Sequence, residues 1–538
     1  MGGGSLAEGT QAEGRRIAMI TTIAMIARDR KNKISPRRRG ELARGVGTAI
    51  INGIIDNGVI GKTRLTTGDR GGTLSSRKKE AAMLFISRSG ALRLATFSVL
   101  VSALLGASAF AQNTPLDKQV SSVLPDAQTL YLDLHQHPEL SSHETRTAAE
   151  LAGRLRTLGY EVTEHVGGNG VVAILKNGPG PTVMLRTELD GLPVEEKTGL
   201  PYASKVRAKD DNGRDVPVMH ACGHDVHMAA LFGTASIMAH NKDSWHGTLM
   251  LIGQPAEEII TGADKMIKDG LFTRFPKPDV GIALHDTNNL PIGKVGITPG
   301  YAKAAADSIR ITVYGKGGHG AQPHTTIDPV LIAARIAVTV QSIVAREIKP
   351  GEPAVITIGY IQAGTKNNII PDDAQMGLTV RSFKPEVRQH LLASIERVAK
   401  GEAMAAGAEK MPLVEKYEST GAVYNDPVLT KHLAATLEGV LGQGTVVTED
   451  QIMTSEDYAY FVEQGIPSFY FTLGVADPQK LAEAKASGKQ LPSNHSPLFA
   501  PVAEPSIKTG MTAEVTILRD LLKGTPADVK KFTQQQGN

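Results

Sequence analysis

Four short apolar runs constrain the fold of this chain more than any other feature. They lie at 171–175, 182–185, 248–252 and 280–284, and a fifth follows at 469–473. Each is almost continuously apolar, as expected of strands covered on both faces of a sheet. Helical patterns precede them at 120–134 and 144–158, the second ended by Gly159, and others lie between them. The sequence therefore predicts an α/β fold with a mostly parallel sheet and helices on both faces.

The pattern changes between residues 300 and 418. The expected elements are a strand, a helix, two strands, a helix and a strand, at 308–314, 329–346, 354–361, 374–383, 385–406 and 411–417. This β-α-β-β-α-β order is that of the ferredoxin-like α+β unit. Because α/β signals resume afterwards, we interpret 300–418 as a domain inserted between two parts of the first domain, at 112–299 and 419–538.

The first 111 residues differ in composition from the rest. They hold 18 Lys and Arg against 7 Asp and Glu, a net charge of +11, which leaves −8 of the overall +3 for the remainder. This acidic remainder argues against nucleic acid as a partner. Residues 1–82 are rich in Gly and Arg and lack a sustained apolar period, which indicates disorder or a start codon assigned too early.

Residues 83–111 have the pattern of a secretory signal peptide. Arg88 and Arg93 precede a short apolar run, and small residues ending at Ala111 follow it. A membrane anchor is the alternative, but the run 94–105 is too short to span about 30 Å of hydrocarbon as a helix. We expect cleavage after Ala111 and a periplasmic or secreted protein without a membrane span in the mature chain. A nucleic-acid-binding basic tail fits poorly with export.

Candidate ligands and carboxylates follow three of the expected strands. Glu188 and Asp190 follow the second apolar run, Glu257 and Glu258 follow the third, and His285 closes the fourth. In open α/β sheets, binding sites lie beyond the carboxyl ends of the strands. The sequence therefore predicts that these side chains meet at one edge of the sheet.

Cys222 is the single cysteine of the chain, which excludes an internal disulfide. It lies two residues before His224, so in non-helical backbone both side chains can turn to one side and hold a cation. A lone cysteine is more often an inert buried residue. The histidines, the aspartate and the glycine at 219–225 nevertheless favour a metal thiolate.

The pair Glu257 and Glu258 is the candidate for the chemical step. Neighbouring side chains outside a helix project differently, so one carboxylate can bind a metal while the other faces a water. A metal lowers the pKa of its water toward about 7, and an adjacent carboxylate can accept the proton. A solvated pair at a helix start is the alternative. His285 and His495, taken singly, would be ordinary strand-end and loop histidines.

Taken together, these residues resemble a known family. The matching stretches lie at 134–140, 185–193, 219–225, 254–258, 315–320 and 495–497. They are similar to those of the dinuclear metal amidohydrolases that cleave N-acyl amino acids, the group of hippurate hydrolases, aminoacylase-like enzymes and plant auxin-conjugate hydrolases. The resemblance spans 135–522 and implies a zinc-peptidase-like fold and hydrolysis of an amide bond.

The resemblance also implies roles for individual residues. Glu257 is the implied general base, and His319 the implied histidine that reaches the partner subunit's site and stabilises the oxyanion. Asp190 would orient the ligands from behind, and Asn368 and Arg381 would lie near the substrate carboxylate. Without the resemblance, His319 is a surface turn residue and Arg381 a charge on a sheet face. The implied ligands of two divalent ions are Cys222, His224, Glu258, His285 and His495, with Cys222 shared.

The sequence departs from the usual pattern of this family in three places. Glu188 stands where Asp is more familiar, Ile259 and Ile260 follow the glutamate pair where Gly is expected, and Asp286 follows His285. The first two can reshape the acyl pocket. None removes an implied ligand or the base, so we expect an active enzyme.

We therefore expect an exported hydrolase of small N-acyl amino acids that uses two divalent ions, with a homodimer formed through the inserted domain. The thiolate favours zinc, and the other ligands leave manganese, cobalt or nickel open. One alternative is a metallo-carboxypeptidase or dipeptidase with the same site. The other is a periplasmic binding protein without catalysis, against which Glu257 argues.

Overall fold

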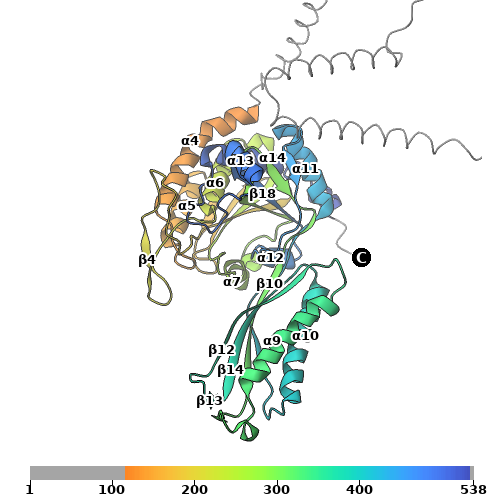
Figure 1. The fold of residues 1–538 in the computed structure, drawn as a ribbon. Helices are drawn as coiled ribbons and strands as arrows, with labels where there is room; N and C mark the ends of the chain where they lie inside the picture. Colours follow the sequence, from red (N-terminus) through yellow and green to blue (C-terminus); the bar gives the residue numbers. More distant parts are fainter. Residues whose placement is uncertain (1–114, 534–538) are drawn as a thin grey trace, which may run out of the picture. The chain divides into compact units, whose positions relative to one another are not determined.

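The computed structural model describes residues 115–533. The extension expected at 1–82 and the signal peptide expected at 83–111 lie outside these residues. An eight-stranded sheet forms the centre of the described chain (Figure 1). In spatial order its strands are β1 (Glu161–Thr163), β2 (Val171–Asn177), β6 (Gly247–Gln254), β3 (Thr182–Glu188), β7 (Val280–Pro291), β18 (Ser468–Ala476), β8 (Val295–Ile297) and β17 (Val446–Thr448).

The sheet is parallel in its centre and mixed at its margins. Strands β6, β3, β7 and β18 pair in parallel, whereas β1 and β2 are antiparallel to their neighbours and β8 is antiparallel to β18. The predicted α/β fold class is confirmed. The sequence predicted a mostly parallel sheet without assigning a direction to each strand, and β2 is antiparallel to β6.

Helices cover both faces of this sheet, which explains the continuous apolar runs. In β6, Leu249 and Leu251 face one hydrophobic core, while Met250 and Ile252 face the other. The helices of the first core are α4 (Pro115–Gln136), α5 (Thr145–Thr157), α6 (His224–His240), α11 (Pro427–Leu441), α14 (Ala503–Leu521) and α15 (Pro526–Lys531). Those of the second are α7 (Gly262–Lys268), α8 (Leu271–Arg274) and α12 (Ala459–Glu463).

A second, four-stranded antiparallel sheet belongs to the inserted domain, with the spatial order β12-β14-β10-β15. Two helices pack on it (Figure 1) around an aliphatic core. Along the chain the elements are β10 (Ala305–Tyr314), α9 (Pro329–Arg346), β12 (Ala354–Ala363), β14 (Asp373–Ser382), α10 (Pro385–Ala405) and β15 (Leu413–Thr420). This is the predicted β-α-β-β-α-β order. The domain limits themselves stay predictions.

Short elements complete the described chain. They are the pairs β4 (Arg207–Lys209) with β5 (Asp215–Pro217), β9 (Gly300–Lys303) with β16 (Val423–Asn425), and β11 (Gly318–His319) with β13 (Ile369–Ile370), the helix α13 (Pro478–Ser487), and the 3-10 turns η1 (Lys242–Ser244) and η2 (Pro323–Thr325).

Two local findings differ from, or add to, the sequence expectations. The fourth apolar run was expected to end at His285, which is wrong, because β7 continues to Pro291 in register with β18. Within residues 115–533, α9 is the one helix long and apolar enough to cross a membrane by length and composition. That is weak evidence for a span, because Ile332, Ile336 and Val340 of this helix pack in the core of the inserted domain.

Candidate active site

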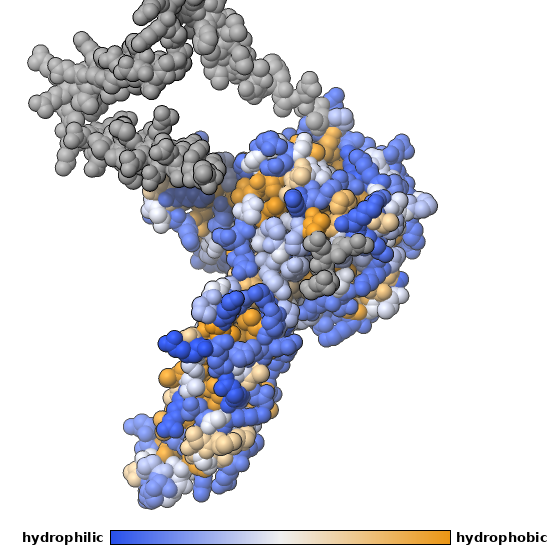
Figure 2. All heavy atoms as spheres, turned by 90° about the vertical axis from the view of Figure 1, so that its right-hand side faces the viewer, coloured by the Kyte–Doolittle hydropathy of each residue, from blue (hydrophilic) through white to orange (hydrophobic). Residues whose placement is uncertain are grey.

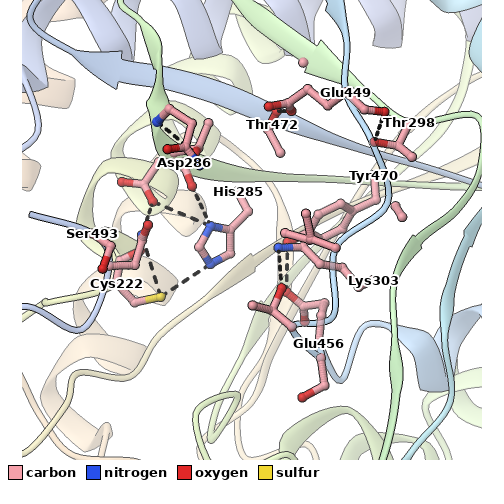
Figure 3. A pocket seen from close by; sticks show the side chains of 18 of the residues that line it. Cys222, His285, Asp286, Thr298, Lys303, Glu449, Glu456, Tyr470, Thr472 and Ser493 are labelled. Carbon is pink, nitrogen blue, oxygen red and sulfur yellow. Dashed lines mark hydrogen bonds and ion pairs between the residues drawn. The ribbon is translucent and has the colours of Figure 1, made fainter. Parts of the chain in front are cut away.

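The candidate site lies at the edge of the sheet where β3 and β6 end. Glu188 is the last residue of β3, Glu257 and Glu258 follow β6, and His285 lies on the neighbouring β7. A cavity of about 590 Å³ opens here, and both glutamates of the pair and His285 line it together with Cys222 and His495 (Figure 3). The predicted convergence of these segments is therefore present.

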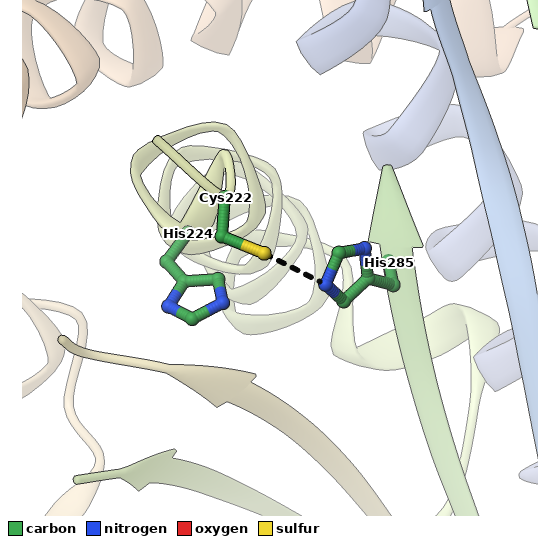
Figure 4. A group of neighbouring side chains, drawn as sticks. All are labelled: Cys222, His224 and His285. Atoms are coloured by element: carbon green, nitrogen blue, oxygen red, sulfur yellow. Dashed lines mark hydrogen bonds between the residues drawn. The ribbon is translucent and has the colours of Figure 1, made fainter. Parts of the chain in front are cut away.

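Cys222 and His224 reach the site from a turn at the start of α6. Gly223 between them has a φ of 77°, a left-handed conformation that glycine adopts without strain. A Cβ at this glycine would lie 2.0 Å from Oδ2 of Asp286. The Sγ atom of Cys222 lies 3.4 Å from Nε2 of His285 (Figure 4). The turn thus brings the thiol and two imidazoles together at the sheet edge.

Backbone carbonyls fix the orientation of both imidazoles. Nδ1 of His224 lies 2.8 Å from the carbonyl oxygen of Asp190, and Nδ1 of His285 lies 2.9 Å from that of Asp286. A carbonyl oxygen can only accept, so Nδ1 of each ring carries a proton, and in the neutral ring Nε2 presents a lone pair. Nε2 of His224 is buried without a hydrogen-bond partner. This is the orientation of a metal-ligating histidine.

Glu258 and His495 form the other side of the site. Their Oε2 and Nε2 atoms lie 3.3 Å apart, and Oε1 of Glu258 is buried without a partner. The backbone N–H of Glu258 donates to Oδ2 of Asp190 over 3.0 Å. His495 has a φ of 69°, and Ala256 and Ile260, which flank the glutamate pair, have φ values of 52° and 57°. Left-handed backbone at non-glycine residues persists only where the surroundings enforce it, often at functional sites.

The carboxylates give the site a strongly negative field. Burial, reinforced by Glu258 and Glu257, raises the pKa of the Cys222 thiol well above its ordinary value. Burial opposes protonation of His224, yet Asp190 and Glu188 raise its pKa to about 10. A site that retains protons this strongly also favours a cation, and a bound cation would stabilise the thiolate.

The pKa of Glu257 is raised, whereas the pKa of His285 is lowered. Burial and the nearby Glu456 and Glu258 raise the pKa of Glu257 well above its ordinary range. Burial and the nearby His227 and Lys303 lower the pKa of His285 to about 3, which keeps this imidazole neutral. A neutral imidazole is a ligand, and a carboxylate with an elevated pKa is a proton acceptor.

The donor atoms fit two cations that share one sulfur. Cys222, His224 and His285 offer ligand atoms that all lie within 4.8 Å of one another, and so do Cys222, Glu258 and His495. The unpartnered Nε2 of His224 and Oε1 of Glu258 are the orphaned buried atoms that such ions would satisfy. Oε2 of Glu257 lies 3.8 Å from Nε2 of His224, beside the donor set.

The remaining predicted site residues divide into two groups. Arg381 lines the cavity and donates to Oγ of Ser455 over 2.7 Å, and Asp190 supports His224 from behind. His319 and Asn368 do not line the cavity. They lie in the inserted domain around the small β11–β13 pair, where the N–H of Gly320 donates to the carbonyl of Asn368 over 2.9 Å.

An ion network behind the site was not found from the sequence. The buried guanidinium of Arg186 lies 2.8 Å from Oε1 of Glu456 and 3.1 Å from Oδ1 of Asp457, and it also donates to Glu188. A signal was available: the two carboxylates at 456–457 directly precede the buried aromatic Tyr458, much as Glu188 and Asp190 follow an apolar strand.

His227 is a second residue that the sequence interpretation missed. The backbone N–H of Asp286 donates to its Nε2 over 2.9 Å, so Nδ1 carries the proton and donates to Oε2 of Glu188 over 2.9 Å. His227 therefore holds the backbone next to His285. One carboxylate oxygen of Glu188 accepts from Arg186, and the other accepts from His227. Glutamate, which stands here where aspartate is more familiar, therefore has a structural role.

The sequence and the fold of this chain are both similar to those of known proteins. Residues 184–487 match the model of Peptidase family M20/M25/M40. Thermostable carboxypeptidase 1 of Saccharolobus solfataricus is 38% identical over 71% of this chain and 92% of its own length. Hippurate hydrolase of Campylobacter jejuni is 36% identical over 61% of this chain and 83% of its own length. The crystal structure of the Bacillus subtilis YXEP protein, a dinuclear metal binding peptidase, has a TM-score of 0.61 at 29% identity, covering 75% of this chain and 99% of that protein.

Proposed function

Because the chain belongs to Peptidase family M20/M25/M40 and is an amide-bond hydrolase, we propose that it cleaves the amide bond of N-acylated amino acids. The observation that carries the proposal is the arrangement at the sheet edge. There the Nε2 atom of His224, the Sγ of Cys222 and a carboxylate oxygen of Glu258 converge beside the buried Glu257. The similarity to a hippurate hydrolase supports this substrate class.

We propose that Cys222, His224, Glu258, His285 and His495 hold two divalent ions, with Cys222 shared. The thiolate favours zinc, and the imidazole and carboxylate ligands leave manganese, cobalt or nickel open. When bound, such ions supply Lewis acidity, which lowers the pKa of water and polarises an amide carbonyl. Asp190 keeps Nε2 of His224 turned toward the ions through its carbonyl oxygen.

Glu257 is the proposed general base. It is buried beside the donor set, and the surrounding carboxylates increase its affinity for a proton. It would accept a proton from the attacking water and return it to the leaving nitrogen, which needs that proton to depart as an amine. Glu258 accepts no proton in this scheme, because it is a ligand.

Arg381 is the proposed anchor for the substrate carboxylate. Within the described chain it has no carboxylate partner, and its only hydrogen-bonded side chain is Ser455. Burial lowers the pKa of this guanidinium, as expected of a cation that lacks a counter-ion. A carboxylate of the substrate would supply that counter-ion.

A homodimer formed through the inserted domain would complete the site. His319 and Asn368 lie away from the cavity of their own chain, so they would act on the partner's site. Apolar side chains of the inserted domain reach the surface (Figure 2). On α9, Leu331 is 54% and Val338 76% exposed, and the edge strand β12 exposes Ile361. Burial of these residues between two copies would explain them.

A second candidate is a metallo-carboxypeptidase or dipeptidase with the same donor set. The similarity to Thermostable carboxypeptidase 1 favours it. The two functions differ in the group that precedes the scissile amide, an acyl group in one and an amino acid with a free amine in the other.

The deciding experiment measures hydrolysis by the metal-loaded mature protein. Benzoyl-glycine and a set of N-acetyl amino acids are compared with free dipeptides of the same C-terminal residues. We expect the acylated substrates to have the higher kcat/KM. Higher turnover of the free dipeptides would replace the proposal by the peptidase.

Export is proposed from the sequence pattern at 83–111 alone. N-terminal sequencing of the protein from the periplasm and from the medium tests it, with Gln112 as the expected first residue. Full-length protein that remains in the cytoplasm would refute it.

A further inference from the structure

One cation in the active-site cavity has no role in the proposed chemistry. Lys303, at the end of β9, lines the cavity together with Arg381 and the candidate metal ligands. Its Nζ donates to Oγ1 of Thr454 over 3.3 Å and lies 5.7 Å from the centre of the Tyr470 ring (Figure 3). The ammonium therefore points into the space where a substrate would lie.

This ammonium lacks a counter-ion among residues 115–533. An ammonium has three N–H donors, and Thr454 accepts from one of them. Several carboxylates line the same cavity, and three of them are engaged elsewhere. Glu456 pairs with Arg186 over 2.8 Å, Glu258 lies 3.3 Å from His495, and Glu449 accepts from Thr472. A partly buried cation without a counter-ion is costly unless a ligand supplies the opposite charge.

Lys303 and Arg381 lie on the same side of the cavity. Lys303 is hydrogen-bonded to Thr454, and Arg381 to the adjacent Ser455. Within the described chain, the site thus offers two cations that lack a carboxylate partner and are hydrogen-bonded to neighbouring residues. The α-carboxylate of one amino acid requires only one of them.

We propose that Lys303 binds a second carboxylate, carried by the side chain of the amino acid that the reaction releases. The enzyme would then favour N-acyl derivatives of dicarboxylic amino acids, of the aspartate and glutamate kind. This inference rests on the proposed function, because it assigns the substrate class of the same site. It makes Lys303 a specificity-determining residue.

The test compares substrates that differ only in the second charge. The kcat/KM for N-acetyl-glutamate is divided by that for N-acetyl-glutamine, which has the same shape without the charge. We expect a ratio of about tenfold or more in the wild type, because a site built for a polar group discriminates strongly against a ligand that lacks it. Lys303→Met should bring the ratio close to one, and Lys303→Arg should keep it well above one.

Two controls make the result specific. Lys268→Met removes a charge from the surface of α7, where this lysine pairs with Asp264 over 2.6 Å, and it should leave the ratio unchanged. A second substrate pair, N-succinyl-glycine and its terminal amide, places the extra charge on the acyl group instead. A ratio that depends on Lys303 only in this second pair would overturn the assignment to the released amino acid.

Other outcomes would also overturn the proposal. In one, Lys303→Met lowers turnover of N-acetyl-glutamate and N-acetyl-glutamine equally, which would make Lys303 a second contact of the α-carboxylate. In another, the wild type shows no preference for the glutamate derivative.

Failure of the proposed function would be recognised separately. If the metal-loaded wild type hydrolyses none of the four substrates, the hydrolase proposal is rejected, and calorimetric binding of N-acetyl-glutamate and N-acetyl-glutamine tests Lys303 directly. Tighter binding of the glutamate derivative that Lys303→Met abolishes would uphold the anion site. Equal binding would overturn it.

Discussion

The central sheet and the sheet of the inserted domain differ in what their strands bury. Strand β3 of the central sheet ends in a buried ion network in which Arg186 contacts Glu188, Glu456 and Asp457. The four-stranded sheet of the inserted domain instead packs its inner face against two helices through aliphatic side chains. The central domain therefore buries several charged side chains, whereas the core of the inserted domain is almost entirely apolar.

This difference indicates that buried side chains have different roles in the two regions: they position ligands in the central domain and stabilise the fold in the inserted domain. Burying an ion pair seldom adds net stability, because desolvation offsets the attraction. The network behind the site is therefore better explained by the ligand geometry that it fixes. The inserted domain gains its stability from apolar burial, and it carries His319 and Arg381 outside its core. The predictions below test this division, beginning with the largest expected effect.

Glu257→Gln should lower kcat by about 10³-fold or more, because the amide cannot accept a proton. Metal content and melting temperature should stay close to those of the wild type, since the shape of the side chain is preserved. Steady-state kinetics and elemental analysis measure both quantities. Full hydrolysis with metals bound would refute the proposed mechanism.

His319→Ala should lower kcat by roughly 10²- to 10³-fold, the usual effect of removing one oxyanion donor. Mixing this variant with Glu257→Gln tests whether the histidine acts on the partner. Each hybrid dimer would contain one intact site, so about a quarter of wild-type activity should return at equal mixing. No recovery, despite subunit exchange demonstrated with tagged chains, would contradict action across the dimer.

Ile336→Ala should destabilise the inserted domain by about 2–5 kcal/mol, because Ile336 is fully buried in its aliphatic core. Denaturant unfolding monitored by hydrogen exchange would locate the loss in α9 and its sheet. Gln341→Ala, an exposed position on the same helix, is the matched control and should change little. Loss of metal from the central domain in Ile336→Ala would contradict the proposed division of roles between the two domains.

His227→Gln should weaken metal binding by roughly 10- to 100-fold, the usual effect of losing a residue that orients a ligand. The amide cannot satisfy both Glu188 and the N–H of Asp286 in the geometry of the imidazole, so His285 would be less well positioned. Competition with a chelator measures the affinity. Unchanged affinity together with a lower melting temperature would make His227 a purely structural residue.

Glu514→Gln should change how stability depends on pH. Burial raises the pKa of Glu514, which is hydrogen-bonded to Thr234, to about 8. The folded state thus binds this proton more tightly than the unfolded state, and stability falls as pH rises from about 4.5 toward 8. The variant should lack this fall, which amounts to at most about 1.4 kcal/mol for each pH unit. Parallel pH profiles of unfolding for both proteins would contradict this.

Some features of this protein follow from short-range sequence patterns. The start of α9 is set by Asp328 and Pro329, an N-cap aspartate followed by proline, and it was predicted at the observed residue. Cys222 and His224 were predicted to converge because side chains two positions apart in non-helical backbone can turn to the same side. The ends of β3 and β6 were predicted because parallel strands finish at a common edge.

Other features escaped prediction because their partners are distant in sequence. Arg186 meets Glu456 across 270 residues, and His227 meets Asp286 across 59. No local pattern distinguishes such residues from ordinary buried or solvated ones. Lys303 belongs to the same class, since only its surroundings show that it lacks a counter-ion.

By itself, the sequence determined the kinds of side chain available, the α/β class and the insertion, because apolar periodicity and turn residues act over a few positions. The tertiary structure alone decided strand direction at the sheet margins, the tautomers of His224, His227 and His285, and which charges are paired. These depend on atoms brought within a few ångströms by folding. Hydrogen bonds and ion pairs act at that range, and sequence separation does not record it.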